Sequence, residues 1–163
     1  MASAKAARRY WLFKSEPGSY DWDTFVRDRR TFWSGVRNYQ ARNLLRDEIH
    51  VGDGVLFYHS NADPMAVVGI AKVVREGYPD PTAFDAGSPY HDPKSRPDAP
   101  TWFVVDIECV QAMVAPVTRE RLQREAPLAD MVLLQRGSRL SVQPVTAGEW
   151  RTILKLGSAK ESW

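Results

Sequence analysis

The sequence of 163 residues is poor in metal-binding and disulfide-forming side chains, with one cysteine and three histidines. A single cysteine, Cys109, cannot form a disulfide within the chain, so nothing demands an oxidising compartment. One cysteine and three scattered histidines are also a poor source for a four-ligand zinc site. We therefore expect no bound metal.

Long apolar runs are missing as well. No stretch approaches the ~20 residues that a membrane span requires, and residues 1–9 lack the apolar segment of a signal peptide. We expect a soluble protein that is not associated with a membrane. Its expected location is the cytoplasm, or the nucleus if the source is eukaryotic.

Several motifs of nucleotide-using and hydrolytic enzymes are absent from the sequence. There is no P-loop, no dinucleotide-binding G-x-G-x-x-G and no G-x-S-x-G nucleophile elbow. These absences disfavour a nucleotide-hydrolysing enzyme or a serine hydrolase. No cofactor is expected.

The charges are nearly balanced, with 22 basic and 20 acidic residues and a net charge of +2. The excess lies in residues 1–9, which hold three basic residues and no acidic one. A histone-like binder held by bulk charge is therefore disfavoured. We expect 1–9 to form a flexible basic arm, 10–156 a single domain and 157–163 a C-terminal tail.

Hydrophobic periodicity and turn residues predict an α+β domain. Strands are expected near 10–14, 55–60, 66–74, 102–110 and 138–142, and helices near 21–29, 39–46, 119–125 and 147–156. Asn38, Thr118 and Thr146 have the residue types that cap helix N-termini. The proline-rich segment 77–101 is expected to be an ordered functional loop, because it also carries aromatic residues. Strands clustered in a curled sheet with helices outside fit a pseudo-barrel.

Segment 27–46 has an unusual composition, with six arginines, one acidic residue and three aromatic residues. Arginine binds phosphates in a bidentate manner, and aromatic rings stack on bases for about 1–3 kcal/mol each. The alternative is a solvated helical face above buried aromatic residues. Trp33 lies in a loop with Gly35, which favours a binding role over plain packing, although packing stays open.

Six segments resemble the EVE domain, a family with bacterial and eukaryotic members. They are 10–17 (YWLFKSEP), 33–43 (WSGVRNYQARN), 54–61 (GVLFYHSN), 78–82 (YPDPT), 90–94 (YHDPK) and 138–145 (SRLSVQPV). The resemblance runs from about residue 10 to 155. It implies a PUA-like fold, a curled mixed sheet flanked by helices, and kinship with YTH domains, which hold N6-methyladenine of RNA in an aromatic cage. It also implies binding of modified cytosines in DNA or of modified RNA bases.

The resemblance also indicates where a base would bind. Lys14-Ser15 and Trp33-Ser34 correspond to the end of the first strand and to one cage wall of YTH domains. The region of the second cage tryptophan carries Tyr90-His91-Asp92 instead. Trp11 is more simply core, and so is Cys109.

Two groups of candidate residues follow from these considerations. The base-binding candidates are Trp33, Ser15, Lys14, Ser34, Asn38, Tyr58, His59, Tyr90 and Asp92. The phosphate-binding candidates are Arg37, Arg42 and Arg139. Asp92 would accept a hydrogen bond from the exocyclic amine of cytosine, whereas Asn38 also has a capping role and Arg139 an alternative as an ion-pair partner.

Three functions are compatible with the sequence. The first is a monomeric module that binds a nucleic acid carrying a modified base, without catalysis. The second is a small ribonuclease-like enzyme, in which His59 acts as a base with Lys14 or Arg37. The third is a metabolite-binding module that uses the same pocket.

Overall fold

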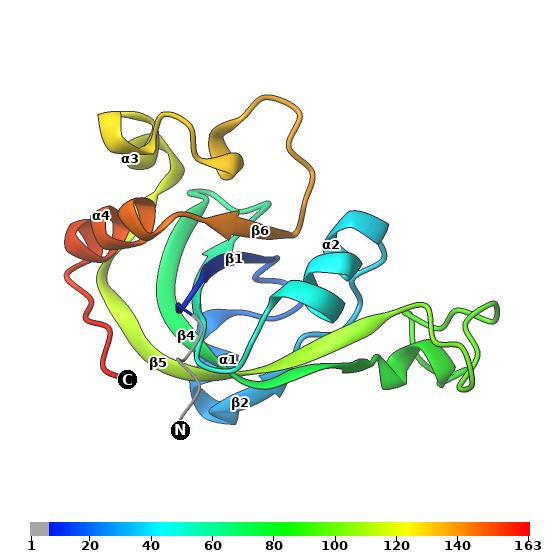
Figure 1. Cartoon of the computed structure of the whole chain (residues 1–163). Coiled ribbons are helices and arrows are strands. Elements are labelled where there is room, and N and C mark those ends of the chain that lie inside the picture. The colour runs from blue at the N-terminus through cyan, green and yellow to red at the C-terminus, as the bar shows by residue number, and fades with distance from the viewer. Residues whose placement is uncertain (1–6) are drawn as a thin grey trace, which may run out of the picture.

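The chain is built around a mixed six-stranded sheet with the strand order β2-β5-β4-β3-β1-β6 (Figure 1). The computed structural model describes residues 7–163. The strands are β1 (Tyr10–Ser15), β2 (Arg30–Phe32), β3 (Gly54–His59), β4 (Ala66–Pro79), β5 (Phe103–Thr118) and β6 (Val142–Val145). β1 and β3 are parallel, and the other neighbours are antiparallel. Because β2 and β6 are not paired with each other, the sheet curls without closing into a barrel.

Four α-helices flank the sheet: α1 (Trp22–Asp28), α2 (Tyr39–Asn43), α3 (Arg119–Gln123) and α4 (Ala147–Gly157). The predicted caps Asn38, Thr118 and Thr146 are confirmed, since each side chain accepts a backbone N–H three residues further on. α2 is shorter than predicted, because a π-helical turn, Leu44–Glu48, continues it. Short 3-10 turns cover Pro81–Phe84, Ala126–Leu128 and Val132–Leu134.

The two faces of the sheet cover two separate cores. Trp11 and Phe13 of β1 point into the first core, which α1 and α2 close. Leu12 points into the second, which α3 and α4 close. Trp11 is fully buried, so its predicted role in the core is confirmed. Cys109 is only partly buried at the edge of the first core, and this burial raises the pKa of its thiol.

The strands differ from the predicted ones mainly in length. β4 and β5 extend several residues past the predicted ends, and irregularities interrupt their register at four places. Such bulges increase local bend and twist, which accounts for the curl of the sheet. β2 was not predicted, because three residues are too few to show a period of two. β6 begins at Val142 rather than at 138, and residues 138–141 belong to a loop.

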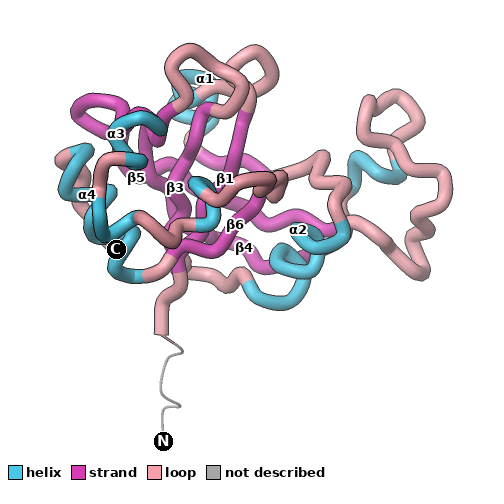
Figure 2. The backbone as a smooth tube through the Cα atoms, turned by 90° about the horizontal axis from the view of Figure 1, so that it is seen from above, coloured by secondary structure: helices cyan, strands magenta, loops and turns pink. Residues whose placement is uncertain are grey.

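Between β4 and β5 the chain leaves the sheet as an arm, residues 80–102, which projects from the body in both views (Figures 1 and 2). Trp102 anchors the arm, because its indole N–H donates to Asp92 at 2.7 Å and its carbonyl accepts the N–H of Asp80 at 2.8 Å. The predicted ordered loop, 77–101, is therefore confirmed, except that residues 77–79 belong to β4.

The ends of the described chain lie against the domain. Arg8 pairs with Glu161, the backbone N–H of Arg9 donates to Asp53 at 3.1 Å, and the indole of Trp163 donates to Gly52 O at 2.8 Å. Arg8, near the end of the predicted basic segment 1–9, thus contacts the predicted C-terminal tail, 157–163. Residues 1–6 of that basic segment lie outside the described residues. Within residues 7–163, no helix is long and apolar enough to cross a membrane.

Candidate functional site

A cavity of about 500 Å³ opens where β1 ends, between the Trp33 loop and the arm. Ligand pockets commonly have about 300–1,000 Å³. Its lining combines aromatic rings with many hydroxyl groups, and it consists of Lys14, Ser15, Glu16, Ser19, Tyr20, Thr31, Phe32, Trp33, Ser34, Gly35, Val36, Tyr90 and Ser141. Aromatic rings together with convergent hydrogen-bonding groups suit a planar, polar ligand.

Trp33 forms the floor of this cavity. Its side chain is 8% exposed, and its ring centroid lies 5.3 Å from that of Phe13 and 5.6 Å from that of Phe57. Tyr20 contacts it edge-on at 6.3 Å. Trp33 therefore belongs to the first core and lines the cavity at the same time, so both roles considered from the sequence apply.

Tyr90 forms a second aromatic wall of the cavity. Its ring can occupy this position because residue 35 is a glycine. Gly35 has a φ of +81°, a conformation that favours glycine. A Cβ at this position would lie 2.7 Å from Cζ of Tyr90, so the ring rests directly on the Gly35 backbone. Tyr90 is 41% exposed, which leaves much of its surface open.

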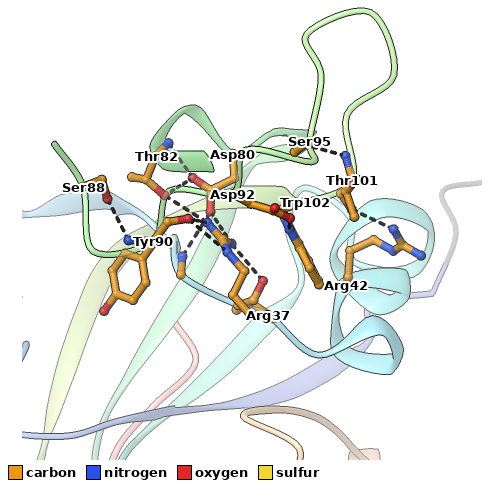
Figure 3. A network of polar contacts seen from close by, with 12 residues as sticks. Arg37, Arg42, Asp80, Thr82, Ser88, Tyr90, Asp92, Ser95, Thr101 and Trp102 are labelled. Carbon is orange, nitrogen blue, oxygen red and sulfur yellow. Dashed lines mark hydrogen bonds and ion pairs between the residues drawn. The ribbon is translucent and has the colours of Figure 1, made fainter. Parts of the chain in front are cut away.

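The carboxylate of Asp80 joins the Trp33 loop to the arm (Figure 3). Asp80 is fully buried, and its Oδ2 accepts the backbone N–H of Gly35 at 3.1 Å and Nη1 of Arg37 at 3.0 Å. Its Oδ1 accepts the backbone N–H and the hydroxyl of Thr82, at 2.8 and 2.6 Å. The two walls of the cavity are thus held at a fixed spacing.

Arg37 has a structural role in the same network. Besides Asp80, its guanidinium donates to the carbonyl of Tyr90 at 2.6 Å and to that of Val36 at 3.0 Å. These bonds occupy the groups that a phosphate would need. The placement of Arg37 therefore does not support the phosphate contact predicted for it, and this arginine holds the cavity walls instead (Figure 3).

The residues at the end of β1 reach the cavity in different ways. Ser15 is 8% exposed, and its hydroxyl donates to the carbonyl of Tyr20 at 2.5 Å. Alternation along β1 puts the Lys14 side chain on the face of Leu12, opposite to Ser15. Burial and the charge of Arg119 lower the pKa of Lys14. Lys14, Ser15 and Ser34 all contribute to the lining of the cavity.

Tyr58 and His59 lie outside the cavity lining. Tyr58 is 1% exposed in the second core, and its hydroxyl has no hydrogen-bond partner in the described part of the chain. His59 accepts the backbone N–H of Trp22 at 3.1 Å through Nε2, at the start of α1. Burial lowers the pKa of His59, and the charges of Asp21 and Asp23 oppose this. Neither placement supports a contact with a base.

Asn38 and Asp92 are also engaged elsewhere. The Asn38 side chain caps α2 by accepting the backbone N–H of Ala41 at 3.0 Å. Asp92 accepts the indole N–H of Trp102 and the backbone N–H of Lys94, and these hydrogen bonds lower the pKa of its carboxyl. The predicted contact of Asp92 with cytosine is therefore unsupported, because the carboxylate stabilises the arm.

The two remaining arginine candidates differ in their surroundings. Nη1 of Arg42 donates to the carbonyl of Thr101 at 2.7 Å, and its Cζ lies 5.1 Å from the centroid of the Tyr39 ring. Arg139 is exposed and lies two residues before Ser141, which lines the cavity. A phosphate contact by either residue stays a prediction.

Several lining residues were not among the sequence candidates: Glu16, Ser19, Tyr20, Thr31, Phe32, Val36 and Ser141. Glu16, Ser19 and Tyr20 follow the Lys14-Ser15 motif directly, so the turn after β1 was the available signal. Ser141 comes from the other end of the chain, and its carbonyl accepts the N–H of Lys14 at 2.8 Å. Within residues 7–163, no group of three or more His, Cys, Asp or Glu side chains is placed to hold a metal ion.

Comparison with protein families and curated proteins gives a consistent result. The family model described as the EVE domain matches residues 9–156. Thymocyte nuclear protein 1 of Mus musculus is 39% identical, and the alignment covers 97% of this chain and 77% of that protein.

Solved structures show the same relationship. A hypothetical protein from Leishmania major has a TM-score of 0.89 and 42% identity, over 93% of this chain and 96% of that one. Human THYN1, solved in complex with DNA that contains 5-methylcytosine, has a TM-score of 0.85 and 35% identity, over 94% and 99% of the chains. A YTH domain from Zygosaccharomyces rouxii, 16% identical with a TM-score of 0.54, shares the fold alone. The chain therefore belongs to the EVE domain family and has its PUA-like fold.

Proposed function

We propose that the cavity beside Trp33 binds one base of a nucleic acid and distinguishes a modified base from its unmodified form. One observation carries the proposal: aromatic surfaces and hydroxyl groups converge on a cavity of about 500 Å³ with fixed walls. The human relative solved with DNA that contains 5-methylcytosine supports a methylated cytosine in DNA as the ligand.

The aromatic residues supply the stacking surfaces in this proposal. The base stacks against the open side of Tyr90, above the floor that Trp33 forms. A base–aromatic stack contributes about 1–3 kcal/mol, whereas extruding a base from a duplex costs a few kcal/mol. Single-stranded or mispaired positions should therefore bind best.

The hydroxyl groups supply the polar contacts to the edge of the base. Ser15 ends β1, Ser34 lies in the Trp33 loop, and Ser141 lies just before β6. The Ser15 hydroxyl already donates to the carbonyl of Tyr20 and can still accept, whereas the hydroxyls of Ser34 and Ser141 can both donate and accept. This set suits the mixed donors and acceptors of a nucleobase edge. Glu16 adds an acceptor at the same end of β1, suited to an exocyclic amine.

The expected preference for the modified base is moderate. A methyl group in a fitted slot contributes about 1–3 kcal/mol, which corresponds to roughly 5–150-fold in the dissociation constant. Such a ratio separates a reader from a general single-strand binder, for which it is close to one.

The ribonuclease alternative is disfavoured, because two of the three groups proposed for it are engaged in other hydrogen bonds. The acceptor nitrogen of His59 is occupied by the backbone N–H of Trp22, and Arg37 is bound to Asp80 and Tyr90. A general base needs a free acceptor within hydrogen-bond reach of the substrate. The metabolite alternative uses the same cavity, so only binding measurements with different ligands distinguish it from the proposed function.

The test is a titration with short oligonucleotides that differ at one central position. Cytosine, 5-methylcytosine, adenine and N6-methyladenine are compared in single- and double-stranded DNA and in RNA, at two salt concentrations. We expect 5-methylcytosine to bind roughly 5–150-fold more tightly than cytosine. Equal affinity for all four would refute the proposal, and failure to bind any nucleic acid at low salt would favour a metabolite. Oligonucleotide cleavage that is lost in His59→Ala would favour the enzyme.

A further inference from the structure

Tyr39 is an unusually exposed aromatic residue next to the cavity. It is 62% exposed at the start of α2, and it is absent from the cavity lining. Its ring is stacked on that of Trp102, with 5.0 Å between the centroids and 30° between the planes. Much of the Tyr39 ring is therefore open to solvent, although the other partner of the stack is buried.

Trp102 gives this stack a fixed support. Trp102 is 5% exposed, and hydrogen bonds to Asp92 and Asp80 fix its side chain and its backbone. The backbone of Tyr39 begins α2, whose N-terminus Asn38 caps, and its ring packs on that of Trp102. A rigid ring loses little conformational entropy when a ligand stacks on it, which is an advantage in binding.

A partly free positive charge lies beside the exposed ring. Cζ of Arg42 is 5.1 Å from the centroid of Tyr39. Its Nη1 and Nε donate to Thr101 and Asn43, while Nη2 has no hydrogen-bond partner among residues 7–163. An oriented guanidinium with a free nitrogen next to an open aromatic ring suits a nucleotide, which joins a phosphate to a base.

This surface is continuous with the cavity. The guanidinium of Arg37 lies between the two, with its Cζ 5.2 Å from the Trp102 ring centroid and 5.8 Å from that of Tyr90. Tyr90 in turn lines the cavity. A strand that places one base in the cavity can therefore run along this side of the molecule past Arg37 to Tyr39.

We propose that Tyr39 is a second stacking platform, which binds a base next to the captured one in the same strand, with Arg42 contacting the phosphate. This inference rests on the proposed function, because it assumes that the cavity takes a base. Stacking tolerates any base, since every base has a π-face. Tyr39 therefore adds affinity and leaves the preference for the modified base unchanged.

The competing role for Tyr39 is to cover Trp102 and stabilise the arm. That role would lower the midpoint of thermal unfolding in a Tyr39 variant without changing the affinity of the folded protein for nucleic acid. Binding is therefore measured well below the unfolding transition of each variant.

The experiment compares Tyr39→Leu with Tyr39→Phe in single-stranded oligonucleotides that carry cytosine or 5-methylcytosine. The leucine keeps an apolar side chain but removes the ring, whereas phenylalanine keeps the ring. We expect Tyr39→Leu to weaken binding of both oligonucleotides by the same factor, roughly 5–150-fold, and Tyr39→Phe to bind like the unchanged protein. Val114→Ala, at a residue that is 80% exposed, is the control and should leave binding unchanged.

A cross-linking experiment locates the contact directly. Oligonucleotides with 5-iodouracil on either side of the modified position are irradiated with the protein, and the adduct is mapped by mass spectrometry. We expect an adduct at Tyr39 from one side only, and its loss in Tyr39→Leu. Unchanged affinity in Tyr39→Leu, or adducts at other residues alone, would overturn the inference.

The outcomes also separate this inference from the proposed function. If the unchanged protein binds cytosine and 5-methylcytosine equally and Tyr39→Leu still weakens both, base reading fails and the platform stands. If the preference for 5-methylcytosine is present and Tyr39→Leu has no effect, the platform fails alone.

Discussion

The ring of Tyr90 rests on the backbone of Gly35, so closely that a Cβ at residue 35 would lie 2.7 Å from Cζ of Tyr90. This contact sets the width of the cavity at a point where the Trp33 loop meets the arm. Residue 35 is a glycine for two reasons: its φ is +81°, and a side chain would displace the ring of Tyr90. The position of Tyr90 in the cavity wall therefore depends on the absence of a Cβ at residue 35.

Gly35→Ala should impair binding more than it impairs stability. The positive φ costs a non-glycine residue about 1–2 kcal/mol, and the methyl group also moves Tyr90 out of place. Urea unfolding measures the loss of stability, and oligonucleotide titration measures the effect of displacing the Tyr90 ring.

Gly137→Ala is the matched control, since Gly137 has a φ of +79° and no atom within 4 Å of the added Cβ. It should cost a similar free energy of unfolding and leave binding intact. If Gly35→Ala binds as well as Gly137→Ala, the contact with Tyr90 does not shape the site.

Asp80→Asn should destabilise the protein strongly. Asp80 is fully buried, accepts four hydrogen bonds and pairs with Arg37 at 3.0 Å. Removing one charge of a buried pair costs about 3–5 kcal/mol, because the other charge is left without compensation. The free energy of unfolding in urea measures this loss, and Arg96→Ala, in an exposed ion pair, should change it by less than about 1 kcal/mol. A loss for Asp80→Asn as small as that of Arg96→Ala would contradict the network described above.

The stability of the protein should fall in mild acid through His59. Its Nε2 accepts the N–H of Trp22 only when the ring is neutral, and burial lowers its pKa below the ordinary value of 6.5. The unfolded chain then binds the proton more readily, so this contribution is complete above pH 6.5 and is lost as the pH falls below it. Between the two pKa values the loss is at most about 1.4 kcal/mol per pH unit.

His59→Gln provides the comparison for this effect, because its side-chain oxygen can accept the same N–H without titrating. Unfolding free energies between pH 7.5 and pH 5 should decline more steeply in the unchanged protein than in the variant. Parallel pH profiles for the two proteins would show that His59 carries no such linkage.

Tyr58→Phe should leave binding unchanged and keep or increase stability. The hydroxyl of Tyr58 is buried without a hydrogen-bond partner among the described residues, and leaving such a group unsatisfied costs about 1–3 kcal/mol. Removing it should raise the free energy of unfolding by up to about 1 kcal/mol. A clear loss of oligonucleotide affinity in Tyr58→Phe would contradict this prediction and show that the Tyr58 hydroxyl contributes to binding.

Local features of the fold could be predicted from the sequence, because their causes are local. The caps at Asn38, Thr118 and Thr146 follow from side chains that bond to the backbone three residues on. The burial of Trp11 follows from its place in an apolar strand. The lengths of β4 and β5 could not be predicted from the sequence, since bulges interrupt their pairing and disturb the alternation of buried and exposed residues.

The candidate site was predictable only in part. The motifs placed Lys14, Ser15, Trp33, Ser34 and Tyr90 at one site, and all five line the cavity. Tyr58 lies one residue after Phe57 of the first core, so the pleat points it to the other face of the sheet. The partners that occupy Arg37 and Asp92 lie in segments whose contacts depend on the folded arm, and the local sequence does not specify such contacts.

The central claim is that the cavity beside Trp33 and Tyr90 reads the modification. Trp33→Ala is a poor test, because removing a tryptophan from the core costs about 3–5 kcal/mol. Trp33→Phe and Tyr90→Leu change the cavity surface with less damage, since phenylalanine retains an aromatic ring and Tyr90 is 41% exposed.

The most direct measurement is the ratio of the dissociation constants for cytosine and 5-methylcytosine oligonucleotides, in the unchanged protein and in these two variants. We expect a ratio of roughly 5–150 in the unchanged protein. It should fall towards one in Trp33→Phe and Tyr90→Leu, and Tyr39→Leu should leave it unchanged. A ratio that is the same in all four proteins would contradict the account, because the modification would then be read elsewhere or not at all.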